Sequence, residues 1–183
     1  NKKKNIIKKI RIPLIGLHNI RNSVAATAVA ITIGISVSDV KKGLINFKGV
    51  QRRFNFLFEK KGAVFFDDYA HHPTEIESLL DGVKSVYKKK EIICIFQPHR
   101  ISRVNNLKSQ FSKSFKKADI VILCPIYKAG ENIKLNFSYL SFARSIIKNS
   151  KVNLITIQNE RELNKLMKNI AYGQKIFIGM GAG

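Results

Sequence analysis

Apolar positions follow different patterns on either side of residue 53. Beyond it, short runs that are apolar at nearly every position alternate with segments in which apolar residues recur every three or four positions. A short continuous apolar run is typical of a strand buried on both faces, and the longer spacing is typical of an amphipathic helix. We therefore expect strands and helices to alternate along residues 54–183.

The fold class predicted for this part is α/β, a doubly wound and mostly parallel sheet between helices. Ligands of such sheets bind beyond the carboxyl ends of the strands. The expected strands cover residues 54–59, 63–68, 91–96, 119–124, 152–157 and 175–180, and the expected helices cover 73–87, 105–117, 138–149 and 160–170.

Residues 1–53 have fewer elements. Residues 6–16 alternate enough to predict a strand that turns at Gly16, and residues 19–35 carry small and apolar residues at helical spacing, which predicts a buried helix. Ser38 is available to cap a second, shorter helix. One strand and two helices leave faces uncovered, so we predict two domains, with 1–53 as the C-terminal part of a larger domain and 54–183 as the second.

Four expected strands end in unusual polar or glycine-rich stretches. Because the carboxyl ends of parallel strands meet at one edge of a sheet, these stretches predict a binding site there. They read DDYAHHP at 67–73, QPHRISR at 97–103, CPIYKAGE at 124–131 and GMGAG at 179–183.

The adjacent histidines His71 and His72 do not predict a metal site. Neighbouring side chains diverge, and no further histidine or cysteine lies at a usual ligand spacing. A simpler interpretation has Pro73 starting a helix, with His72 near its N-cap and Glu75 in its first turn. That interpretation leaves Asp68 and its neighbours unexplained.

Two further pairs have the chemistry of ligand recognition. Arg100 and Arg103, beside His99, would share a helix face and suit a carboxylate or phosphate, although a solvated basic surface is the alternative. Asn19 and Asn22 also share a helix face, and their amides can donate and accept as an adenine edge requires. Helix capping is an equal explanation for these asparagines.

The net charge of +21 invites a nucleic-acid interpretation, but the composition argues against it. Of 33 basic residues, 25 are Lys and 8 are Arg, and the densest lysine runs contain no interleaved aromatic residues. We therefore predict no specific nucleic-acid partner. No apolar run is long enough for a membrane span and no signal peptide is evident, which favours a cytoplasmic protein. Cys94 and Cys124 lie in apolar runs and are expected to be free, buried thiols.

Six elements in register resemble the Mur ligases, and within them the members that join L-alanine to UDP-N-acetylmuramate. They read G-x-H-N-x-x-N-S-x-A-A from Gly16, F-x-G-V-x-R-R-F from Phe47, D-D-Y-A-H-H-P-T-E from Asp67, F-Q-P-H-R-x-S-R from Phe96, C-P-I-Y-x-A-G-E from Cys124 and a final G-A-G. The match runs from about Leu14 to Gly183, nearly the whole chain.

The resemblance implies a bacterial, cytoplasmic enzyme with a UDP-substrate domain, a central ATP-binding domain and an amino-acid-binding domain. This chain would hold the end of the second and most of the third, cut at both ends. No GxxxxGK[ST] phosphate loop occurs here, so that loop and the Mg²⁺ ligands are expected upstream. The chain alone is expected to be inactive.

The implied reaction belongs to peptidoglycan precursor synthesis. ATP phosphorylates the carboxylate of UDP-N-acetylmuramate, and the amine of L-alanine then displaces phosphate to give an amide. The nucleotide-binding positions implied by the motifs are His18, Asn19, Asn22, Arg53 and Asp68. The positions around L-alanine are Tyr69, His71, Arg100 and Arg103, with His71 as the catalytic candidate that orients the amine or assists proton removal. His72 is expected to be structural.

Two alternatives remain open from the sequence. A related ligase recycles a murein tripeptide onto the same UDP-sugar and has a similar DDxAHHP element. A basic nucleic-acid-binding module is the other, and it predicts binding that weakens steeply with salt.

Overall fold

The computed structural model describes residues 6–131 and 137–182. The chain divides into two compact units, Asn1–Val50 and Gln51–Gly183, and each is described by itself. This division falls three residues before the predicted boundary between residues 53 and 54, so Arg52 and Arg53 belong with the second unit.

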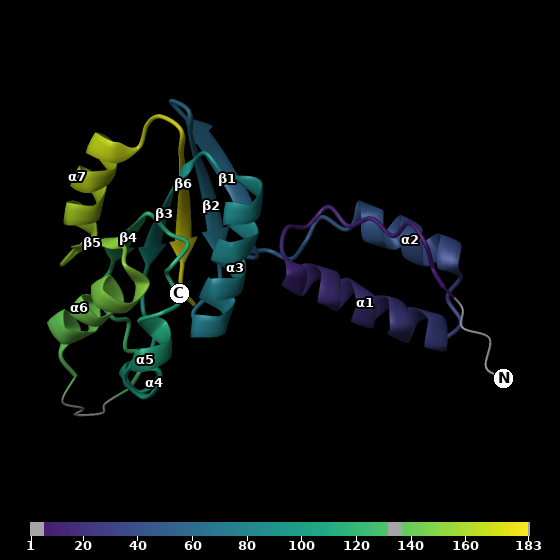
Figure 1. Cartoon of the computed structure of the whole chain (residues 1–183), viewed down its shortest axis with the longest axis horizontal. Coiled ribbons are helices and arrows are strands. Elements are labelled where there is room, and N and C mark those ends of the chain that lie inside the picture. The colour runs from purple at the N-terminus through teal and green to yellow at the C-terminus, as the bar shows by residue number, and fades with distance from the viewer. Residues whose placement is uncertain (1–5, 132–136, 183) are drawn as a thin grey trace. The chain divides into compact units, whose positions relative to one another are not determined.

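The second unit is built on a six-stranded sheet in the order β1-β2-β6-β3-β4-β5 (Figure 1). β1 pairs antiparallel with β2, and every other neighbouring pair is parallel. The predicted α/β class with a mostly parallel sheet is therefore confirmed. The strands are β1 (Asn55–Lys60), β2 (Ala63–Asp68), β3 (Glu91–Phe96), β4 (Ile120–Leu123), β5 (Asn153–Thr156) and β6 (Lys175–Met180).

Both faces of this sheet are covered by helices, as buried parallel strands require. Alternate strand residues point to opposite faces. Val64, Phe66, Ile176 and their counterparts pack with α3, α5 and α6, whereas Phe65, Phe177 and their counterparts pack with α7. The helices of this unit are α3 (Pro73–Val86), α4 (Ile101–Asn106), α5 (Lys108–Phe111), α6 (Tyr139–Ser150) and α7 (Glu160–Ile170).

The single helix predicted at 105–117 is wrong. Only the last residues of α4, then α5 and a series of turns occupy that stretch. A tertiary contact explains the difference: the Ser150 hydroxyl donates to Ser112 O at 2.7 Å and accepts from Phe115 N at 3.1 Å. These bonds replace helical ones and hold the turn against α6.

The first unit contains α1 (Leu17–Thr32) and α2 (Val37–Asn46). The strand predicted at 6–16 is wrong, because described residues 6–15 form no regular element. A strand needs a hydrogen-bonding neighbour, and the described part of this unit offers only helices. The cap of α2 is Ser36, whose hydroxyl accepts from Asp39 N at 3.1 Å, and not Ser38.

The prediction that the first helix is buried is also wrong. Of the residues in α1, only Thr27 is buried, and Val24 and Val29 are each 62% exposed. Among the described residues of the unit, α1 packs against α2, and two helices cannot cover each other's full circumference.

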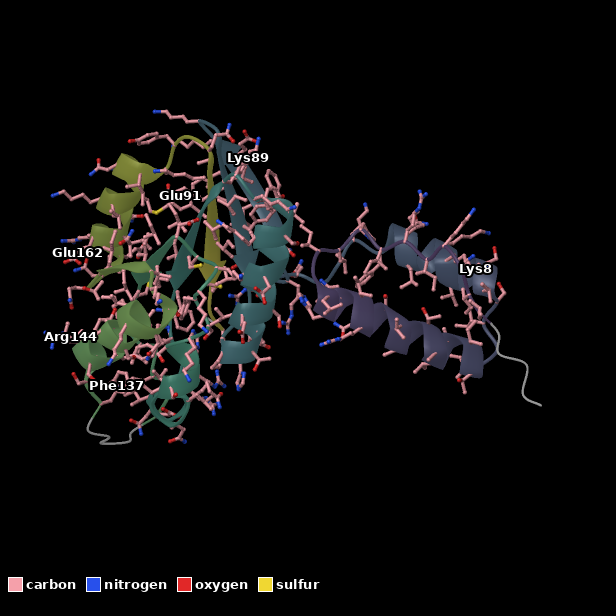
Figure 2. All side chains as sticks on the ribbon, in the orientation of Figure 1. Lys8, Lys89, Glu91, Phe137, Arg144 and Glu162 are labelled. Atoms are coloured by element: carbon pink, nitrogen blue, oxygen red, sulfur yellow. The ribbon has the colours of Figure 1, made fainter. Side chains whose placement is uncertain are left out.

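An ion pair lies at the amino ends of two neighbouring strands. Glu91 at the start of β3, labelled in Figure 2, pairs with Lys175 at the start of β6 over 3.6 Å. Cys94 and Cys124 are free and buried, as predicted. No helix within residues 6–131 and 137–182 is long and apolar enough to span a membrane.

Candidate active site

The polar loops meet at the carboxyl edge of the sheet, as predicted. The last residues of four adjacent strands lie in register: Asp68 pairs with Met180, Met180 with Phe96, and Phe96 with Leu123. After β6, the chain passes close to the loop that follows β3. A Cβ on Gly181 would lie 3.1 Å from Gln97 O, so this close approach requires glycine.

Asp68 lies buried at the end of β2. Its carboxylate accepts backbone hydrogen bonds from one residue before β1 and one residue after β2. Its Oδ2 accepts from Phe54 N and its Oδ1 accepts from Ala70 N, each at 2.7 Å. Burial raises the pKa of Asp68 above its ordinary value, although the Ala70 and Phe54 N–H groups and the charge of Arg53 oppose this. The carboxylate thus fixes the chain around it, and its role toward a nucleotide stays a prediction.

Arg52 joins three segments at this edge. Its Nε lies 3.2 Å from Asp67 Oδ2, and its Nη2 donates to Gly181 O at 2.9 Å. The guanidinium carbon lies 5.0 Å from the Tyr69 ring centroid, a cation–π contact. The motifs predicted a role for Arg53 and none for Arg52. The Arg-Arg pair just before β1 and the Asp-Asp pair at the end of β2, which meet at the open end of the β1–β2 hairpin, were the available signal.

Glu75 organises the start of α3. Its Oε2 accepts from His71 N at 3.0 Å and His72 N at 3.2 Å, and its Oε1 lies 3.7 Å from Arg53 Nη1. Burial raises the pKa of Glu75, but these N–H donors and the nearby positive charges outweigh it, so the pKa is lowered. The interpretation of Pro73 as the first helical residue is confirmed, and His72 is the N-cap.

His71 lies beside Tyr69 with its ring oriented by the backbone. Its Nδ1 is 2.9 Å from Tyr69 O, and the two rings meet edge to face with centroids 5.0 Å apart. A carbonyl oxygen can only accept, so Nδ1 carries the proton when the imidazole is neutral. The Nε2 lone pair is then available as a proton acceptor.

The segment after β3 holds three side chains with polar groups that lack a hydrogen-bond or ion-pair partner among the described residues: His99, Arg100 and Arg103. Among the described residues, neither guanidinium makes an ion pair or hydrogen bond, and Nε2 of His99 has no partner although His99 is only 5% exposed. Burial lowers the pKa of His99, and the charges of His71, Arg103 and Arg52 lower it further. The guanidinium groups of Arg100 and Arg103 therefore add positive charge here without an ion pair among the described residues.

In the first unit, the predicted nucleotide-binding residues lie at the start of α1. A Cβ on Gly16 would lie 2.7 Å from His18 Cε1, so the ring occupies space that only glycine leaves open. Asn19 Nδ2 donates to Ile15 O at 2.7 Å, whereas the exposed Asn22 makes no side-chain hydrogen bond with the described residues. Asn19 is thus partly engaged in local structure, and Asn22 is not.

Within the described ranges, no group of three or more His, Cys, Asp and Glu residues is placed to hold a metal ion.

Comparison with known proteins decides the family. Residues 52–183 match the model of the Mur ligase, glutamate ligase domain. The chain belongs to the Mur ligase family. The resemblance seen in the sequence motifs is confirmed, and the edge just described is the carboxyl edge of a Mur ligase domain.

Relatives of this Mur ligase chain are alanine ligases by name. It is 62% identical over 182 residues to UDP-N-acetylmuramate–L-alanine ligase of Pelagibacter ubique, covering 99% of the chain and 39% of that protein. It is 40% identical over 172 residues to the ligase of the same name from Brachyspira hyodysenteriae, covering 94% of the chain and 37% of that protein.

A solved structure agrees with these relatives. The UDP-N-acetylmuramate–alanine ligase of Thermotoga maritima superposes with a TM-score of 0.77 at 29% identity, over 95% of this chain and 36% of that one. The Mur ligase chain therefore spans well under half the length of the proteins it matches.

Proposed function

We propose that the full-length protein joins L-alanine to the carboxylate of UDP-N-acetylmuramate, with ATP, in the cytoplasmic synthesis of a peptidoglycan precursor. Two relatives that match nearly the whole chain carry that activity in their names. The structural observation that supports it most is the unpaired Arg100 and Arg103 at the carboxyl edge of the sheet.

The arginine pair suits the carboxylate of an incoming amino acid. Guanidinium groups bind carboxylates through paired, charge-assisted hydrogen bonds. Holding L-alanine by its carboxylate leaves its amine free to attack an activated acyl group. Positioning of this kind supplies much of the rate enhancement when no covalent nucleophile is used.

His71 is the proposed proton acceptor in this scheme. The attacking amine must lose a proton as the amide forms, and phosphate leaves the acyl phosphate of UDP-N-acetylmuramate. Since Nδ1 of His71 faces Tyr69 O, Nε2 can orient the amine or receive that proton. Tyr69 contacts both His71 and Arg52 and would lie at the same site.

The nucleotide-binding positions implied by the motifs remain part of the proposal for the full-length protein. We propose that His18, Asn19 and Asn22 approach the adenine and that Arg53 approaches the phosphates. The buried Asp68 would act by shaping the backbone of 53–70 that faces the nucleotide. ATP supplies the phosphoryl group, and Mg²⁺ bound elsewhere would offset its charge.

Amine-dependent release of ADP by the full-length enzyme tests the proposal. With UDP-N-acetylmuramate present, L-alanine should stimulate ADP release strongly and a murein tripeptide weakly. A kcat/KM for the tripeptide far above that for L-alanine would assign the enzyme to peptide recycling instead. Turnover by residues 1–183 alone would contradict the dependence on upstream residues.

A further inference from the structure

The loop after β4, residues 124–131, is bonded to the segment that carries the arginines. Tyr127 N donates to Pro98 O and Arg100 N donates to Tyr127 O, both at 2.9 Å. The loop ends in a tight turn, in which Glu131 N donates to Lys128 O at 3.1 Å. This turn holds the Glu131 carboxylate against the first residues of α4.

Glu131 binds α4 through two bonds to one residue. Ser102 N donates to Oε2 at 3.1 Å, and the Ser102 hydroxyl donates to Oε1. Ser102 is the second residue of α4, where backbone N–H groups have no partner inside the helix. The N-cap residue, Arg100, makes no side-chain capping bond, so the carboxylate of Glu131 supplies that cap from the neighbouring loop.

The helix that needs this cap is unusually dependent on it. α4 has six residues, too few to be stable alone. Arg100, which precedes it, has φ of +64°, a positive value that residues other than glycine rarely adopt. The direction of the Arg100 and Arg103 side chains therefore depends on contacts from outside the helix.

We propose that Glu131 is a positioning residue that orients Arg100 and Arg103 for the carboxylate of the amine substrate. It acts through Ser102 and does not itself touch the substrate. This inference rests on the proposed function for the chemistry of the substrate, and on the contacts above for the role of Glu131.

The surroundings of Glu131 favour its ionised form, which is the form that accepts the two hydrogen bonds from Ser102. The hydrogen bonds from the Ser102 hydroxyl and from the backbone N–H groups of Ser102 and Ile101, with the charge of Arg100, hold the pKa of Glu131 below its ordinary value. The carboxylate stays ionised at neutral pH. Its partial compensation of Arg100 also keeps two neighbouring guanidinium groups at the same site.

Steady-state kinetics of full-length Glu131→Ala test the proposal. We expect KM for L-alanine to rise about tenfold, since small displacements of positioning groups have effects of that size. KM for ATP should change less than about twofold, because α4 carries no proposed nucleotide contact. Glu131→Gln keeps an oxygen acceptor and should restore part of the loss, and Ser102→Ala should give a smaller rise in the same direction.

Glu160→Ala is the matched control, since it removes an equal charge from an exposed position at the start of α7. It should leave both KM values unchanged. In the Arg103→Ala background, Glu131→Ala should add less than it does alone, because one of the two arginines that it orients is gone.

Equal rises in the KM for L-alanine and ATP, or a lower Tm with an unchanged KM for L-alanine, would overturn the positioning role. Full additivity with Arg103→Ala would also do so. Every comparison uses the amine that the wild-type enzyme prefers. A preference for a peptide would therefore contradict the proposed function and still leave the role of Glu131 testable.

Discussion

The ends of β2 and β3 carry similar numbers of charged side chains but use them differently. At the end of β2 and just after it, Asp68 and Glu75 accept backbone hydrogen bonds and Asp67 pairs with Arg52. Beyond β3, the side chains of Arg100 and Arg103 make no ion pair or hydrogen bond within the described residues. The charged side chains at the end of β2 have partners within the protein, whereas the two arginine side chains after β3 have none among the described residues.

This difference distinguishes two roles. We call a loop whose charged groups stabilise the fold a scaffold, and a loop whose charged groups are available to a ligand a receptor. Buried polar groups that find partners stabilise a fold, whereas groups held together without partners are characteristic of ligand sites. The positive charges of Arg100 and Arg103 repel one another, and a bound carboxylate relieves that repulsion. Substitutions beyond β2 should therefore reduce stability, and those beyond β3 should reduce ligand binding.

The largest loss of stability is expected for Asp68→Ala. The N–H groups of Phe54 and Ala70 would lose their acceptor, which costs about 2–4 kcal/mol of unfolding free energy. Urea denaturation of the purified chain measures it. Asp68→Asn retains one acceptor and should lose less, and an unchanged unfolding free energy in Asp68→Ala would show that the loop is not a scaffold.

Glu75→Ala should have the next largest effect. It removes the acceptor of His71 N and His72 N at the start of α3, and such caps contribute about 1–2 kcal/mol. Glu77→Ala, at an exposed position of the same helix, is the control and should change stability by less than about 0.5 kcal/mol. Equal effects of the two variants would exclude a specific cap.

A smaller, pH-dependent effect is expected at His99. Its pKa is lowered in the folded chain by burial and by His71, Arg103 and Arg52, so the unfolded chain takes up a proton first as the pH falls. Stability should fall below about pH 6.5, the ordinary pKa, until the folded-state pKa is reached. His99→Gln should reduce this slope, measured as unfolding free energy at several pH values, and an unchanged slope would contradict burial of a neutral imidazole.

The sheet could be predicted because its information is local. Runs such as 91–96 and 175–180 are apolar at nearly every position, as strands buried on both faces must be. Once these strands are parallel, their polar ends must meet at one edge. The predictions of a strand at 6–16 and of a buried helix at 19–35 were wrong. Alternation and apolar spacing do not show which partner, if any, covers a segment.

The pairing within the site could not be predicted from spacing alone. Arg52 was missed because its acceptor, Gly181 O, lies 129 residues away in sequence. The contact of Phe54 N with the Asp68 carboxylate was also missed, because the β1–β2 hairpin brings these two residues together from positions 14 apart in sequence. Glu131 had no assigned role, because its contact with Ser102 depends on how two loops after adjacent strands fold against each other.

The distinction between scaffold and receptor is tested most directly by Arg103→Ala in the full-length enzyme. Arg144→Ala is the matched control, since Arg144 is an exposed residue of α6 (Figure 2). We expect Arg103→Ala to raise KM for L-alanine about 10- to 100-fold, the loss of a charge-assisted hydrogen bond, with little change in KM for ATP or in Tm. An unchanged KM for L-alanine together with a lowered Tm would contradict the account.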